Sequence, residues 1–151
     1  MGAGMQKIGF NEALSQILDE DPRYKVQAYG FIREALDFTI KHFDKPVEGP
    51  GRHVSGTELL EGIRTFALQE YGPLTKTVFG TWGIHETQDF GHLVFNLVGK
   101  GVLGKTEEDK LEDFQSGYDF HEAFRKPFLP RAKRPAQETK QSKRVPESDE
   151  A

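Results

Sequence analysis

One segment of the chain combines residue types that can hold phosphate. Residues 99–106 are GKGVLGKT, which matches the phosphate-binding loop pattern of two spaced glycines followed by a lysine and a hydroxyl residue. In such a loop, backbone N–H groups surround the phosphates, the lysine neutralises their charge and the hydroxyl group holds magnesium. Those roles would fall to Gly99, Gly104, Lys105 and Thr106.

The surrounding sequence disfavours this nucleotide site. Too little chain with apolar periodicity follows the loop to build the repeated strand–helix units of a parallel sheet. Gly99 and Gly101 also stand where a helix needs a C-terminal cap. The acidic run 107–109 would repel an anion from the helix that should follow the loop. We therefore keep the loop only as a disfavoured alternative and predict no cofactor.

Histidines and nucleophiles give weaker signals. His85, Asp89 and His92 are spaced by four and three residues, so on one helix they would share a face. Asp89 equally suits a helix cap, and we predict no metal site. The sequence contains no G-x-S-x-G motif, and cysteine is absent. Nothing in these residues argues for an enzyme, and we predict a non-enzymatic protein.

The charges are distributed unevenly along the chain. The net charge is −4, but residues 1–51 carry −2, residues 52–124 carry −6 and residues 125–151 carry +4. The basic residues of this last part are Arg125, Lys126, Arg131, Lys133, Arg134, Lys140, Lys143 and Arg144. Such asymmetry indicates an electrostatic partner, which would be RNA, a ribosome-like surface or an acidic protein. A solubilising role, or folding back onto the chain's own acidic domain, fits the tail equally well.

The elements that position these residues are predicted to be helices. Asn11 is expected to cap a short helix, and Asp21-Pro22 is expected to begin a long helix that covers 24–43. The segment 55–58, SGTE, has the pattern of a capping box and should open a helix that ends at Gly72. Apolar spacing predicts two further helices, over 74–82 and 87–98.

The segment after Gly101 allows two interpretations. We predict a small hairpin with strands near 102–105 and 111–115 on either side of a polar tip. A helix over 107–115 fits Leu111 and Phe114 as well. With the hairpin, the chain is mainly α (α+β) and has the element order of a winged helix. The predicted parts are a disordered N-terminus (1–9), an N-terminal helical extension (10–51), a winged-helix-like domain (52–126) and a disordered basic tail (127–151).

The acidic charge of this domain bears on its partner. A helix that binds DNA bases offers basic or amide groups, and the predicted wing instead carries an excess of carboxylates around residues 107–113. A DNA-binding transcriptional regulator is therefore the weaker alternative. A protein partner suits the acidic domain better.

Long stretches of the chain also suggest a family. These are DPRYKVQAYGFIREALDF at 21–38, HVSGTELLEGIRTFALQEYG at 53–72, and residues 82–124 with DFGHLVFNLV, KTEEDKLEDF and YDFHEAF. They resemble an uncharacterised family of small proteins restricted to Planctomycetes and Verrucomicrobia. The resemblance covers about residues 10–124 and leaves out the basic tail. The family has no assigned activity, cofactor or catalytic residue, so the resemblance implies no functional residue here.

The expected function is therefore binding. No run of 18 apolar residues occurs and the first ten residues lack an apolar signal core, so we expect a cytoplasmic protein with no membrane contact. We expect an adaptor whose acidic domain contacts protein and whose tail contacts RNA, a ribosome-like surface or an acidic partner. The alternatives are a nucleotide-binding protein that uses residues 99–106 and a DNA-binding regulator.

Overall fold

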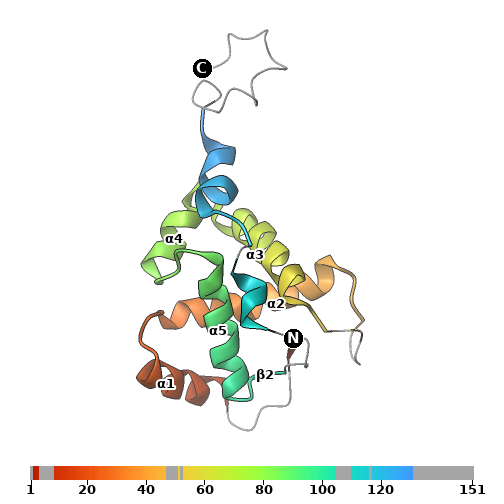
Figure 1. Cartoon of the computed structure of the whole chain (residues 1–151), viewed down its shortest axis with the longest axis vertical. Helices are drawn as coiled ribbons and strands as arrows, with labels where there is room; N and C mark the ends of the chain where they lie inside the picture. The colour runs from red at the N-terminus through yellow and green to blue at the C-terminus, as the bar shows by residue number, and fades with distance from the viewer. Residues whose placement is uncertain are drawn as a thin grey trace.

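The computed structural model describes residues 2–3, 9–46, 51, 53–104, 110–115 and 117–130, and the predicted mainly helical fold is confirmed. Its α-helices are α1 (Phe10–Glu20), α2 (Val26–His42), α3 (Gly56–Tyr71), α4 (Thr75–Thr81) and α5 (Thr87–Gly99). Shorter turns are η2 (Gly72–Leu74), η3 (Leu111–Phe114), the π-helical η4 (His121–Arg125) and η5 (Lys126–Phe128). In Figure 1, α1 and β2 lie near one end of α5, and η4 and η5 stand at the opposite end of the molecule.

The first two helices begin at residues other than those predicted. α1 is capped by Gly9 instead of Asn11, and α2 is capped by Lys25 instead of Asp21. The Asp21 carboxylate accepts hydrogen bonds from Arg23 and Asn96, so it is not free to cap the next helix. The long helix predicted over 24–43 therefore forms as Val26–His42.

The predicted start of α3 is confirmed in detail. The Ser55 hydroxyl oxygen accepts a hydrogen bond from the Glu58 backbone N–H at 3.0 Å, and a Glu58 carboxylate oxygen accepts one from the Ser55 N–H at 3.0 Å. This reciprocal capping box satisfies two N–H groups that a helix end otherwise leaves unpaired. Lys45 also pairs with Glu58 at 3.1 Å, which ties the end of α2 to the start of α3.

The close approach of α2 and α3 depends on a glycine. Gly62 of α3 is buried and faces Thr39 of α2, whose hydroxyl donates to the Ala35 carbonyl oxygen at 2.7 Å. A Cβ atom added to Gly62 would overlap the Thr39 side chain. The absence of a side chain at position 62 therefore sets the distance between the two helices.

One hydrophobic cluster includes residues of all five α-helices, from Ala13 of α1 to Phe124 of η4. The helices of the predicted N-terminal extension thus pack into the same core as α3, α4 and α5. Fully buried Phe79 of α4 lies near its centre and contacts the rings of five other aromatic residues. These are Phe31, Trp82, Phe90, Phe120 and Phe124.

The predicted hairpin is wrong. Its first strand exists as β2 (Leu103–Gly104), but β2 pairs antiparallel with β1 (Gly2–Ala3), near the start of the chain. Its second strand is the 3₁₀ helix η3, and the predicted polar tip, residues 106–110, lies outside the described residues except for Lys110. Strand β1 also lies in the segment 1–9 that was predicted to be disordered, so that prediction is wrong for Gly2–Ala3.

The spacing of two apolar residues explains η3. Leu111 and Phe114 are three residues apart, so one turn of helix points both at α5, where Gly91 leaves room for them. The Thr87 hydroxyl donates to the Phe114 carbonyl oxygen at 2.6 Å and accepts from the Gly117 N–H at 3.2 Å. A strand would direct residues 111 and 114 to opposite faces and lose one of these contacts.

We predict opposite effects for alanine at two helical glycines. Gly62→Ala should lower the free energy of unfolding by about 1–3 kcal/mol, because the added methyl group overpacks the contact with Thr39. Gly30→Ala in α2 is the matched control, since its Cβ would meet nothing within 4 Å. It should raise stability by about 0.5–1 kcal/mol through helix propensity. Urea denaturation measures the free energy of unfolding of both variants. Equal effects of the two substitutions would contradict the close contact between Gly62 and Thr39.

Candidate functional site

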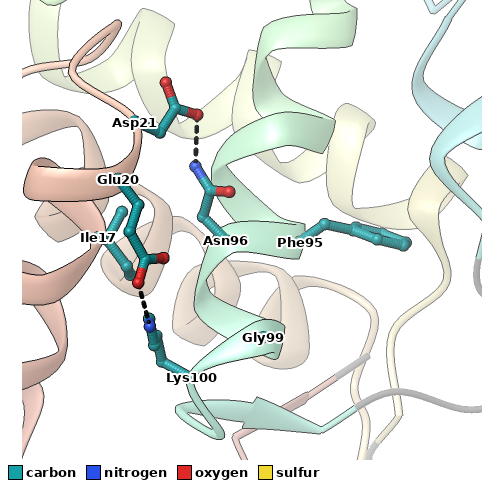
Figure 2. Close-up of a pocket in the computed structure, with 7 residues that line it drawn as sticks. All are labelled: Ile17, Glu20, Asp21, Phe95, Asn96, Gly99 and Lys100. Carbon is teal, nitrogen blue, oxygen red and sulfur yellow. Dashed lines mark hydrogen bonds and ion pairs between the residues drawn. The ribbon is translucent and has the colours of Figure 1, made fainter.

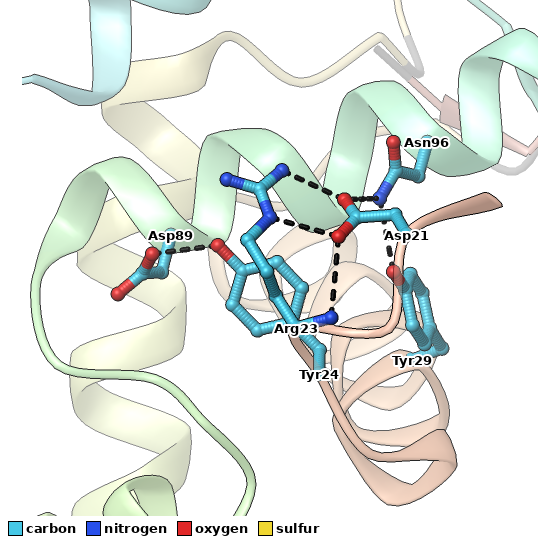
Figure 3. A network of polar contacts seen from close by, with 6 residues as sticks. All are labelled: Asp21, Arg23, Tyr24, Tyr29, Asp89 and Asn96. Carbon is cyan, nitrogen blue, oxygen red and sulfur yellow. Dashed lines mark hydrogen bonds and ion pairs between the residues drawn. The ribbon is translucent and has the colours of Figure 1, made fainter. Parts of the chain in front are cut away.

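A network of polar side chains joins α1, α2 and α5 (Figure 3). Arg23 donates to both oxygens of the Asp21 carboxylate, through Nε at 2.8 Å and Nη2 at 2.7 Å. The Asn96 amide of α5 donates to Asp21 at 3.0 Å and to the Tyr29 hydroxyl of α2 at 2.9 Å. The Arg23 hydrogen bonds, with help from Asn96, hold the pKa of Asp21 well below its ordinary value.

A second hydrogen bond continues this contact between α5 and the start of α2. The Tyr24 hydroxyl donates to the Asp89 carboxylate at 2.6 Å. The other oxygen of Asp89 accepts from the backbone N–H groups of His85 and Glu86, at 2.8 and 3.2 Å. Burial raises the pKa of the Tyr24 phenol well above its ordinary value, and the hydrogen bond to Asp89 raises it further. Tyr24 therefore stays protonated and acts as a fixed donor.

Beside the network is a small cavity of about 160 Å³ between α1 and α5 (Figure 2). Its lining residues are Ile17, Glu20, Asp21, Phe95, Asn96, Gly99 and Lys100. Lys100 pairs with Glu20 across the opening at 2.8 Å, and Asp21 is held by Arg23 and Asn96. The polar groups around the cavity thus bind one another, and these contacts connect the end of α1 to α5.

A second groove, of about 230 Å³, lies between the first turns of α3 and the segment after η3. It is lined by Thr57, Leu60, Glu61, Asp113, Gly117 and Tyr118. The Tyr118 hydroxyl donates to the Leu60 carbonyl oxygen at 2.9 Å, and Arg64 pairs with Glu61 at 3.2 Å. This groove is acidic at its rim, as expected for a domain of negative net charge.

Exposed apolar side chains occur where α3 and α4 end and in the turn η2 between them. Leu74 of η2 is 62% exposed and follows Tyr71 by three residues. Tyr71 and Trp82 are partly exposed, with ring centroids 5.9 Å apart in an edge-to-face arrangement. We call Tyr71, Leu74 and Trp82 the end patch. Exposed apolar groups that lie together are a feature of binding surfaces.

The structure describes only the first part of the predicted phosphate loop. The segment before it, which a nucleotide site needs as a strand, is α5, and Gly99 is the last residue of that helix. Gly101 follows with φ of +77°, as a glycine that ends a helix does, and Gly104 belongs to β2. Lys105 and Thr106 lie outside the described residues. The described part of the loop is therefore the end of a helix, a turn and a short strand.

The other predicted chemical residues also have defined positions. Asp89 accepts backbone and tyrosine hydrogen bonds, as described above, and His85 stands outside α5, before its first residue. Among the residues that the structure describes, no group of three or more histidine and acidic side chains is placed to hold a metal ion. No helix of the described chain is long and apolar enough to cross a bilayer.

The basic residues of the tail divide into two groups. Arg125 is exposed at the end of η4, and Lys126 pairs with Glu122 at 2.9 Å. Pro127 and Phe128 form part of η5, although they were predicted to belong to the disordered tail, so the ordered chain continues past position 126. Arg131, Lys133, Arg134, Lys140, Lys143 and Arg144 lie outside the described residues.

Comparisons with known proteins add no information about the function of this site. No family model, curated protein or solved structure matches this chain.

Sequence reasoning missed the end patch and the partners of Asp21. The exposure of Leu74 depends on how η2 leaves α3, and its apolar character had suggested a place on a buried face. The Asp21–Asn96 hydrogen bond joins residues 75 positions apart. Its only signal in the sequence is an amide on the otherwise apolar segment 93–98 of a helix.

We predict that Asp21 stabilises the fold at neutral pH. Because its pKa in the folded protein lies below the ordinary value of 3.8, its contribution is complete well above that value and is lost as the pH falls below it. Asp21→Asn should lower the free energy of unfolding at pH 7 by about 1–3 kcal/mol, as expected for hydrogen bonds to a charged group.

The difference between wild type and Asp21→Asn should shrink as denaturation is repeated from pH 7 down to pH 2. Asp19→Asn is the control, since Asp19 is exposed and makes no ion pair with another described residue. A penalty for Asp21→Asn that does not change with pH would contradict the role given to its carboxylate.

Proposed function

We propose that the protein is a non-enzymatic binding module that holds RNA through its basic C-terminal segment and presents an acidic helical domain to a protein partner. The observation that carries this proposal is the division of charge along one chain. Residues 1–124 carry a net charge of −8, whereas residues 125–144 contain eight basic residues and a single acidic one. A segment of that composition attracts phosphate without reading bases.

The position of the segment supports this role. Turn η4 is held to the body by buried Phe124, and the Lys126–Glu122 ion pair joins η5 to η4. The chain therefore leaves the domain at Pro130, at the end of the molecule opposite α1 and β2 (Figure 1). Nucleic acid bound to the segment would be held at this end, and the acidic surface of the domain would repel phosphates elsewhere.

The remaining surface of the domain supports a protein partner. The groove beside α3 carries the carboxylates of Glu61 and Asp113, which would repel phosphate. The exposed apolar side chain of Leu74 is likewise a feature of protein contact sites. The proposed protein thus connects two macromolecules, with one contact made by charge and the other by the folded domain.

We predict that a fluorescein-labelled single-stranded RNA binds the full chain with an affinity that falls steeply with salt. Each basic residue that contacts phosphate should contribute about 0.7 to the slope of log K against log salt concentration. Replacing Lys133, Arg134, Lys143 and Arg144 by Gln should reduce that slope and weaken binding at low salt. Fluorescence anisotropy over a salt series measures both quantities.

The matched control replaces the exposed cations of the domain, Lys25, Lys41 and Lys76, by Gln. Their removal should leave the slope nearly unchanged. Binding that is lost in this control and kept in the tail variant would place the RNA on the domain and contradict the proposal. No RNA binding by the full chain at 50 mM salt would contradict it as well.

A further inference from the structure

The end patch lacks a cover in the described chain. Leu74 is the most exposed large hydrophobic residue of the described protein, at 62%. Tyr71 and Trp82 pack edge to face, and both contact the buried ring of Phe31. The ring centroid of Phe31 is 6.2 Å from that of Tyr71 and 5.8 Å from that of Trp82. Two aromatic rings are thus held rigidly in place by the core with part of their surface in water.

Carboxylates flank this patch. Burial raises the pKa of the Tyr71 phenol, and the nearby negative charges of Glu34 on α2 and Glu70 on α3 raise it further. Both glutamates are exposed, and neither forms an ion pair with another described residue. Aromatic rings beside unpaired carboxylates attract a cationic side chain, through the ring faces and through charge.

A cationic segment begins next to the patch. Turn η4 packs against both η2 and α4, the elements that carry Leu74 and lead to Trp82, and η5 follows η4 directly. The described chain ends at Pro130, five residues after the end of η4. Residues 131–144 carry six basic residues and one acidic residue. This segment is therefore covalently attached beside a surface of complementary charge.

We propose that residues 131–144 dock on the end patch of the same chain, with lysine and arginine side chains against Tyr71 and Trp82 and close to Glu34 and Glu70. Because the segment is tethered at Pro130, its effective concentration at the patch is in the millimolar range. This inference rests on the proposed function and deepens it, since the patch and RNA then compete for the same cations. The docked form is a self-inhibited state, and RNA or salt releases the segment.

Trp82 gives a direct readout of docking, because it is the only tryptophan in the chain and belongs to the patch. The test uses the full chain without RNA and follows Trp82 emission from 50 to 500 mM NaCl. If the segment covers the patch at low salt, rising salt should shift the emission to longer wavelength as water reaches the indole ring. A full chain with the six basic residues of 131–144 replaced by Gln should show the shifted emission at every salt concentration.

The carboxylates are tested by Glu34→Gln combined with Glu70→Gln. This pair should reduce the salt-dependent shift and tighten RNA binding roughly three- to tenfold, because the competing contact has been weakened. Glu12→Gln with Asp19→Asn, two exposed carboxylates on α1, is the matched control and should change neither quantity. Circular dichroism confirms that each variant keeps its helices.

The outcomes separate this inference from the proposed function. Trp82 emission that is the same in wild type and tail variant at every salt concentration overturns the docking, whatever the RNA result. Emission that changes with protein concentration but not with the tail assigns the patch to a second copy of the chain, and this also overturns the docking. A salt-dependent shift that requires the tail supports docking even if RNA fails to bind, in which case the proposed function alone is wrong.

Discussion

The packing of aromatic rings around Phe79 determines the arrangement of the other elements. Phe79 is fully buried in a helix of only seven residues, which is too short to be stable alone. Its ring meets Phe31 of α2 and Phe90 of α5 edge to face, with centroids 5.3 Å away in both cases, and Phe124 of η4 at 5.4 Å. Segments more than 90 residues apart in sequence are thus joined at one side chain.

The chemistry of the surface follows from this core. Because Phe120 and Phe124 are part of the aromatic cluster, the turn η4 is fixed to α4, and the basic segment starts from a fixed position. The same packing leaves the outer edges of Tyr71 and Trp82 in water, next to Glu34 and Glu70. In the proposed docked form, the basic segment meets these carboxylates at the end patch.

Local signals in the sequence were sufficient for most of the helices. The Ser55–Glu58 capping box was predicted because both of its hydrogen bonds form within four residues. The start of α2 was misplaced because Asp21 has a partner, Asn96, that a local pattern cannot reveal. The signal for Leu111 and Phe114 was ambiguous, since the choice between strand and turn depended on the space left by Gly91 of α5.

The candidate site was less predictable than the fold. The charge of the basic segment was evident from composition. The residues proposed to complement it come from α2, α3, η2 and the residue that follows α4, and a local pattern cannot reveal how these elements pack. The first glycines of the phosphate-loop pattern have a local structural role. Gly99 is the last residue of α5, and Gly101 forms the turn that follows it, as expected for glycines at a helix end.

The central claim is that the aromatic core holds η4 to the body and so fixes where the basic segment begins. Hydrogen–deuterium exchange of the full chain tests this claim most directly, through the backbone amides of η4. The amide of Ala123, which donates to the Asp119 carbonyl oxygen at 2.9 Å, should exchange about as slowly as amides in the middle of α3. Exchange of η4 that is orders of magnitude faster, while α3 stays protected, would show that the turn opens independently and would contradict the account.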